Sequence, residues 1–223
     1  MKKFNALKFG AWFFLAISIL AIVVSFRYLN YVSTGGDWLT IIYLAATVLS
    51  HFSALSFLIY GLLFVPVALL FKRKQVLIWC AVVIGSVSLL LFILDTFVYD
   101  LYRFHINGFV LDMVFGGAFS EIFVFDFLMY LKVAAFVVLL TAIVYLLARI
   151  IWSLFETDKL RGGKQIAYLL VGLLIGSHLL HAWAYATSYR SIQQSSLYFP
   201  LYFPLRANKL LSKLGVAADN QKQ

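Results

Sequence analysis

Long apolar stretches separated by short charged segments are the feature that most constrains how this chain folds. A helix needs about 20 apolar residues to cross a bilayer core of roughly 30 Å. Five stretches reach that length, and we expect transmembrane helices over residues 9–29, 44–71, 75–95, 127–152 and 166–188. The predicted fold is therefore an all-α, polytopic membrane protein with five transmembrane helices.

Composition leaves little room for any other architecture. Of the 223 residues, 64% are hydrophobic and 12% are charged, which lies outside the usual range of soluble domains. No connecting loop is long enough to enclose an enzyme core of its own. The first apolar stretch is too long for the core of a cleaved signal peptide. The single cysteine, Cys80, excludes an intrachain disulfide and a cysteine-based metal motif.

Basic residues predict the orientation, because lysine and arginine near span ends are retained on the cytoplasmic side. The alternate connections are acidic: residues 30–38 contain only Asp37 as a charged residue, and residues 95–126 contain five acids against Arg103. The N-terminus is therefore expected inside and the C-terminus outside. The segments predicted to be cytoplasmic contain Lys2, Lys3 and Lys8, then Lys72, Arg73 and Lys74, and then Arg149, Lys159, Arg161 and Lys164.

The chain after the last apolar stretch is unusual, because it is basic on the predicted outer side. We expect residues 1–190 to form the transmembrane domain and residues 191–223 to form a tail with a short interfacial helix at about 204–215. Pro204 can begin such a helix and Gly215 can end it. Its basic stripe is Arg206, Lys209 and Lys213, beside an apolar face of Ala207, Leu210, Leu211 and Leu214.

The tail suits an anionic lipid surface. Its basic groups can pair with phosphates while its leucines meet acyl chains. A generic amphipathic anchor explains the same pattern equally well from the residues alone. The doubled unit "YFPLYFPL" before the helix is expected to be an extended aromatic strap along the outer surface, because each proline disfavours helix at the preceding residue.

Histidines are the polar residues within the spans that most invite a functional interpretation. His178 and His181 lie at i and i+3 on one helix face, and His51 or Asp95 could supply a third metal ligand. Hydrogen bonding of these histidines between packed helices is the favoured interpretation. We therefore expect no metal and no cofactor.

Motifs for catalysis and transport are absent from the sequence. It contains no G-x-S-x-G, no H-E-x-x-H and no phosphate loop. A proton-coupled carrier would need acidic residues deep in the membrane and broken helices, but Pro66 is the only proline within a predicted span. We expect the chain not to be an enzyme, and we keep a small transporter as an alternative.

Several blocks, taken in order, resemble the membrane domain of the YejM family of Gram-negative inner-membrane proteins, also called PbgA or LapC. The blocks are "SFRYL", "HFSALSFLIY", "LDTFVYDLYRFHINGFVLDMVF", "SHLLHAWAYATSYR" and "FPLRANKLLSKLG". The resemblance implies five transmembrane helices followed by a linker and a periplasmic domain with a phosphatase- or sulfatase-like fold. This chain stops at Gln223, before any such domain, and so looks like a membrane-domain fragment or a truncated member.

The resemblance also implies a regulatory function in the inner membrane. Such proteins bind lipopolysaccharide (lipid A) in the periplasmic leaflet and engage the LapB adaptor through transmembrane helices, which controls FtsH proteolysis of LpxC. The lipid A contact of the family corresponds here to Arg206, Ala207, Asn208 and Lys209, with Leu210 and Lys213 beside them. Two adjacent arginines of the family pattern are replaced by Asn208 and Lys209, and lysine lacks the bidentate fork of arginine.

One further alternative remains open. Five spans also precede the catalytic domains of phosphoethanolamine transferases and related periplasmic enzymes, for which this chain would serve as the membrane anchor.

Overall fold

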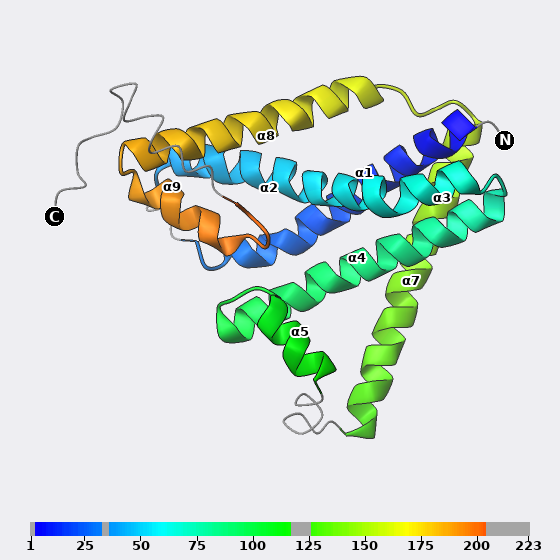
Figure 1. The fold of residues 1–223 in the computed structure, drawn as a ribbon, viewed down its shortest axis with the longest axis horizontal. Coiled ribbons are helices and arrows are strands. Elements are labelled where there is room, and N and C mark those ends of the chain that lie inside the picture. The colour runs from blue at the N-terminus through cyan, green and yellow to red at the C-terminus, as the bar shows by residue number, and fades with distance from the viewer. Residues whose placement is uncertain (1–2, 33–35, 117–125, 204–223) are drawn as a thin grey trace. The chain divides into compact units, whose positions relative to one another are not determined.

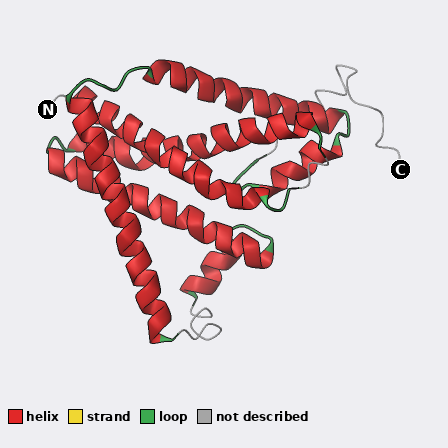
Figure 2. Ribbon diagram, turned by 180° about the vertical axis from the view of Figure 1, so that it is seen from behind, coloured by secondary structure: helices red, strands yellow, loops and turns green. Residues whose placement is uncertain are grey.

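A computed structural model describes residues 3–32, 36–116 and 126–203 of the chain. These residues form helices joined by loops, without any strand in the ranges given (Figure 2). Within these ranges, five helices are long and apolar enough to cross a membrane, which confirms the all-α prediction: Ala6–Leu29, Trp38–Leu70, Lys74–Tyr102, Phe127–Glu156 and Gly163–Ala186.

The helices divide into two compact units, which are described separately. Unit 1 contains Met1–Val24 and Leu55–Arg161, and unit 2 contains Ser25–Ala54 and Gly162–Gln223. Both α1 (Lys3–Leu29) and the second long helix contribute residues to each unit.

The second long helix begins earlier than predicted, at Trp38 instead of residue 44. Asp37 caps it, because its carboxylate accepts hydrogen bonds from the amides of Leu39 at 3.2 Å and Thr40 at 3.1 Å. The helix then runs as α2 (Trp38–Ile59), a π-helical turn η1 (Tyr60–Phe64) and α3 (Val65–Leu70). The π turn lies directly before Pro66, whose missing N–H and bulky ring disrupt regular α-helical hydrogen bonding.

Unit 1 is packed around aromatic rings from α1, η1 and α7 (Phe127–Glu156). The rings of Phe9 and Trp152 lie 4.7 Å apart, and those of Phe14 and Phe64 lie 5.9 Å apart. Such tilted pairs avoid the unfavourable face-to-face arrangement. Phe9, Phe13, Phe14 and Phe64 are fully buried.

In the same unit, α7 packs on α4 (Lys74–Tyr102) at one end (Figure 1). The Lys74 Nζ lies 2.9 Å from Oε1 of Glu156 and 4.9 Å from the centre of the Trp152 ring. Toward Phe127 the two helices diverge, and residues 127–136 are all exposed.

A buried carboxylate organises the turn after α4, which extends to Tyr102 instead of ending near residue 95 as predicted. Asp95 accepts hydrogen bonds from Nδ1 of His105 at 2.7 Å and from the amide of Ile106 at 2.6 Å. The turn leads into the short helix α5 (Gly108–Phe115), capped by Asn107. The connection between the third and fourth predicted spans therefore contains a helix end, a turn fixed by Asp95, and a second helix.

Unit 2 contains α8 (Gly163–Ala186), the short helix α9 (Arg190–Ser195) and the 3₁₀ turn η2 (Ser196–Tyr198), together with part of α2. Figure 1 shows α2 and α8 side by side, with the chain turning back after α8 into α9. Ser188 adopts a left-handed conformation with φ 56° in that turn. The carbonyl of Ala184 accepts from the amide of Tyr189 at 2.7 Å and from Nε2 of Gln193 at 2.9 Å.

Gly10 allows the closest approach within unit 1. A Cβ atom at this position would lie 2.3 Å from Phe64 and 2.8 Å from Tyr60. We expect Gly10→Ala to lower the stability of the purified protein by about 1–3 kcal/mol, because the buried ring of Phe64 has nowhere to move. The measurement is the midpoint of thermal unfolding in detergent.

Gly61→Ala is the matched control, because a Cβ at Gly61 would meet nothing within 4 Å. Equal midpoints for the two variants would contradict the proposed packing at Gly10.

Candidate functional site

The segment after η2 forms the centre of the candidate site. We call residues 199–203 (Phe-Pro-Leu-Tyr-Phe) the strap, which is the described part of the doubled aromatic-Pro-Leu unit that follows Tyr198. Phe199, Pro200 and Tyr202 are buried, whereas Leu201 and Phe203 are exposed. The strap is not fully extended as predicted, because Leu201 has φ 55° and bends the backbone.

Two hydrogen bonds attach the strap to α2. Nε2 of His51 donates to the carbonyl oxygen of Pro200 at 2.8 Å, and the hydroxyl of Tyr43 donates to that of Tyr202 at 3.0 Å. A buried backbone carbonyl outside a helix costs about 1–3 kcal/mol when it has no donor. His51 therefore stabilises the non-helical backbone at the point where the strap enters the protein.

Tyr202 is the residue around which the histidines gather. Its ring centre lies 5.2 Å from that of His51, 5.3 Å from that of His178 and 6.1 Å from that of His181. The sequence predicts these three histidines either as metal ligands or as packed, hydrogen-bonded side chains. The structure brings them together around an aromatic ring, where each packs against Tyr202.

Phe199 completes the packing of the strap. Its ring lies 6.1 Å from that of Phe52, which in turn lies 6.3 Å from that of Tyr28. A continuous aromatic layer in unit 2 therefore joins the strap to α2 and to the last turn of α1.

The ends of α2 and α8 are also connected through Asp37. Hydrogen bonds from Thr40 and from Tyr189 hold the pKa of Asp37 below its usual value, although burial opposes this effect. Hydrogen bonding to a carboxylate favours its charged form. Asp37 therefore caps α2 and contacts the turn after α8 with the same carboxylate.

His51 and His178 each use a ring nitrogen for a hydrogen bond to a backbone oxygen. Nδ1 of His178 donates to the carbonyl of Leu174 in its own helix at 2.9 Å. Within the described ranges there is no group of three or more His, Cys, Asp or Glu side chains that could hold a metal ion. Asp95, the other suggested ligand, belongs to unit 1 and binds His105 and Ile106.

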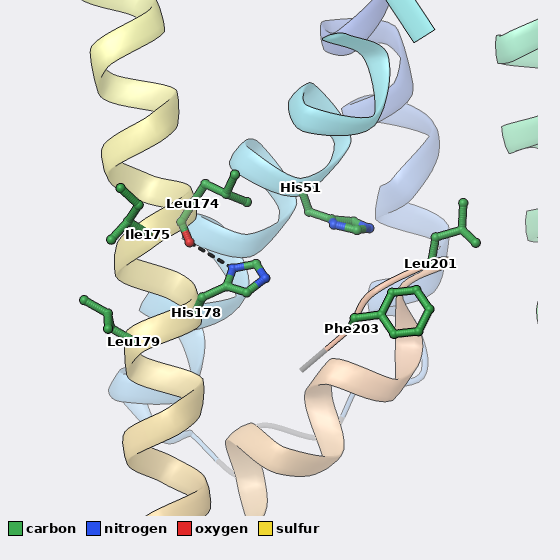
Figure 3. A pocket seen from close by; sticks show the side chains of 7 residues that line it. All are labelled: His51, Leu174, Ile175, His178, Leu179, Leu201 and Phe203. Atoms are coloured by element: carbon green, nitrogen blue, oxygen red, sulfur yellow. Dashed lines mark hydrogen bonds between the residues drawn. The ribbon is translucent and has the colours of Figure 1, made fainter. Parts of the chain in front are cut away.

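A cavity of about 460 Å³ opens beside the strap (Figure 3). Among the described residues that line it, two histidines are polar and the others are apolar. The lining residues are His51 from α2, Leu174, Ile175, His178 and Leu179 from α8, and Leu201 and Phe203 from the strap.

The predicted lipid-binding residues lie outside the described part of the chain. These are Arg206, Ala207, Asn208, Lys209, Leu210 and Lys213, and the predicted helix at 204–215 falls there too. Their assignment stays a prediction, as does the domain boundary after residue 190.

Tyr43, Tyr202 and Phe199, which hold the strap in place, were not identified from the sequence. Tyr43, Thr47 and His51 recur every four residues along α2, which places these polar groups along one side of the helix. That stripe is a signal that could have identified α2 as the partner of the strap.

Comparison with known proteins places the chain among relatives of an inner-membrane protein. A family described as "Domain of unknown function (DUF3413)" matches residues 2–223. The chain is 26% identical over 226 residues to the inner membrane protein YejM of Salmonella typhimurium. It is 25% identical over 215 residues to an uncharacterized protein of Haemophilus influenzae. These relationships confirm the resemblance inferred from the sequence blocks.

The relatives are much longer than the region of similarity. The two alignments cover 96% and 94% of this chain but only 36% and 35% of the relatives. The chain therefore spans about a third of the length of these proteins.

We expect His51→Leu to release the strap. Loss of the donor leaves the buried carbonyl of Pro200 without its 2.8 Å partner, which costs about 1–2 kcal/mol and makes local opening about tenfold more frequent. Amide hydrogen exchange of a peptide covering residues 198–203 measures this opening.

Ser50→Ala is the matched control, since the buried hydroxyl of Ser50 bonds only within its own helix, to the carbonyl of Ala46 at 2.7 Å. If both variants left the exchange of the strap unchanged, the proposed role of His51 would be wrong.

Proposed function

Because the chain belongs to the DUF3413 family and aligns with the inner membrane protein YejM over 96% of its length, we propose that it senses lipopolysaccharide in the inner membrane. In this proposal it binds lipid A in the periplasmic leaflet and controls lipopolysaccharide synthesis. Control acts through a LapB-type adaptor that regulates FtsH proteolysis of LpxC. The chain itself catalyses no reaction.

The observation that supports lipid binding is the attachment of the strap to α2 and α8. Residues 204–215 follow the strap directly, so covalent geometry limits how far the basic segment can lie from this site. Three further residues can extend the chain by about 11 Å at most between Phe203 and Arg206. Arg206, the first base of the stripe, is therefore within about 11 Å of Phe203 along the chain.

The chemistry of the tail supports an anionic lipid as the ligand. Arg206, Lys209 and Lys213 supply positive charges for the phosphates of lipid A, and Asn208 supplies a neutral donor. Backbone amides near the start of the helix add further donors. In this proposal the apolar side chain of Leu210 meets acyl chains, and the small side chain of Ala207 leaves room for the headgroup. Other anionic phospholipids present the same phosphate chemistry and bind more weakly.

The exposed part of α7 supports an interaction with a transmembrane partner. Residues 127–136 are exposed on every side of the helix, so this chain does not cover them in the region described. A partner helix can pack there through van der Waals contacts, which drive association of helices within lipid. We propose that the LapB-type adaptor uses the transmembrane helices in this way.

The orientation in this proposal places the N-terminus in the cytoplasm and the tail in the periplasm, in accord with the distribution of lysine and arginine. In a Cys80→Ser background, Asn30→Cys should react with a membrane-impermeant maleimide in spheroplasts. Lys159→Cys should react only after lysis. Labelling of Lys159→Cys, but not of Asn30→Cys, before lysis would establish the opposite orientation.

Replacement of Arg206, Lys209 and Lys213 by alanine tests lipid recognition. We expect affinity for lipid A to fall roughly tenfold or more, because hydrogen bonds to charged groups contribute about 1.5–3 kcal/mol each before screening by salt. The measurement is binding of lipid A to the purified protein in detergent.

The matched control replaces Lys159, Arg161 and Lys164 by alanine, which removes the same charge from the predicted cytoplasmic side. An equal loss of binding in both triple variants would show a nonspecific charge effect and would overturn the assignment of the tail.

A further inference from the structure

The cavity beside the strap has a largely apolar wall, into which the ring of His178 projects. Five of its lining residues are apolar: Leu174, Ile175, Leu179, Leu201 and Phe203. Its volume of about 460 Å³ lies within the usual range for small-molecule sites, roughly 300–1,000 Å³. The α8 residues in the wall belong to a helix that is long enough to cross a membrane. In a membrane, lipid chains are the most abundant molecules around such a helix.

The hydrogen bond of His178 determines what its other nitrogen can do. The carbonyl of Leu174 can only accept, so Nδ1 carries the proton in this 2.9 Å bond. In the neutral ring, Nε2 is then a hydrogen-bond acceptor. Figure 3 shows this second nitrogen on the far side of the ring from Leu174, facing the space between α8 and the strap.

His51 does not present an equivalent acceptor at Nε2. That nitrogen donates to the carbonyl of Pro200 at 2.8 Å and is therefore engaged by the strap itself. Nε2 of His178, in contrast, is an acceptor that faces the cavity. A saturated acyl chain alone has no donor for it, and an acceptor covered by such a chain loses a hydrogen bond to water without replacement.

We propose that this cavity holds one hydroxylated acyl chain of the bound lipid, with Nε2 of His178 accepting a hydrogen bond from the chain hydroxyl. The inference rests on the proposed function, because lipid A contains 3-hydroxyacyl chains whereas ordinary glycerophospholipids do not. The cavity is also next to the tail, since two of its lining residues, Leu201 and Phe203, belong to the strap. One lipid can therefore contact the basic segment with its phosphates and the cavity with a chain.

A second cavity in unit 2 provides a comparison, because its described lining offers no polar group that could select between acyl chains. It has a volume of about 410 Å³ and only apolar side chains in its wall: Phe26, Leu29, Val32, Ile41, Leu44, Ala45, Val48 and Leu49. Nothing in that wall distinguishes a hydroxylated chain from a plain one. His178 is thus the residue that gives the first cavity its selectivity.

His178→Phe tests the proposal, because phenylalanine keeps a ring of similar size and removes the acceptor. We expect its affinity for lipid A to fall about 3- to 10-fold, the effect of losing one hydrogen bond. Affinity for dioleoyl phosphatidylglycerol should stay unchanged. His178→Gln, whose side-chain oxygen can accept, should restore most of the loss, and Leu179→Met is the control for packing in the same wall.

The wild-type protein provides a second readout that does not depend on phosphates. With ¹⁵N-labelled histidine, 3-hydroxymyristic acid should shift the Nε2 resonance of His178, assigned by its loss in His178→Phe, whereas myristic acid should not. Equal shifts with both acids, no shift with either, or equal weakening of both lipids by His178→Phe would overturn the proposal. Failure of the tail variant to weaken lipid A binding would instead overturn the proposed function and leave the response to the hydroxy acid intact.

Discussion

The hydrogen bond from His51 to the carbonyl of Pro200 is the interaction on which the candidate site depends. The backbone leaves helical geometry at the strap, and in apolar surroundings each of its polar groups needs a partner from elsewhere in the chain. Because His51 donates to this carbonyl, Phe199 and Tyr202 can be buried without leaving a backbone oxygen that lacks a hydrogen bond. The bond between Tyr43 and Tyr202 meets the same requirement for the phenolic hydroxyl, and burial raises the pKa of Tyr202, which keeps that hydroxyl protonated.

The two units solve the problem of helix association in different ways. Unit 1 relies on interlocked aromatic rings, with Gly10 allowing the ring of Phe64 to approach the backbone of α1. Unit 2 uses polar contacts directed at a non-helical segment, and its aromatic rings pack around them. The difference has a physical basis, because side chains packed between helices need only complementary shape in lipid, whereas an irregular backbone needs hydrogen-bond partners at fixed positions.

The arrangement gives the doubled aromatic-Pro-Leu unit an explanation. The first copy supplies Phe199 and Pro200, which are buried, and the backbone bends at Leu201, whose side chain is exposed. The second copy supplies Tyr202, the centre of the histidine cluster, and Phe203, part of the cavity wall. Repetition thus provides two buried anchors on either side of a bend. In the proposed function, these anchors fix the chain directly before the predicted lipid-binding segment, and the cavity beside them suits an acyl chain.

The sequence by itself determined the class of the protein and the position of its five long helices, because hydrophobic length and charged interruptions are local properties. It also contained the local signals for the start of α2 at Asp37 and for the π turn before Pro66. Only the tertiary structure decided which residues form the site. Tyr43 and Tyr202 are 159 positions apart, and a membrane helix is apolar on nearly every face, so hydrophobic periodicity gives little indication of which face meets a partner. The three histidines were recognised individually, but their common partner, Tyr202, was fixed by how the chain turns back after α8.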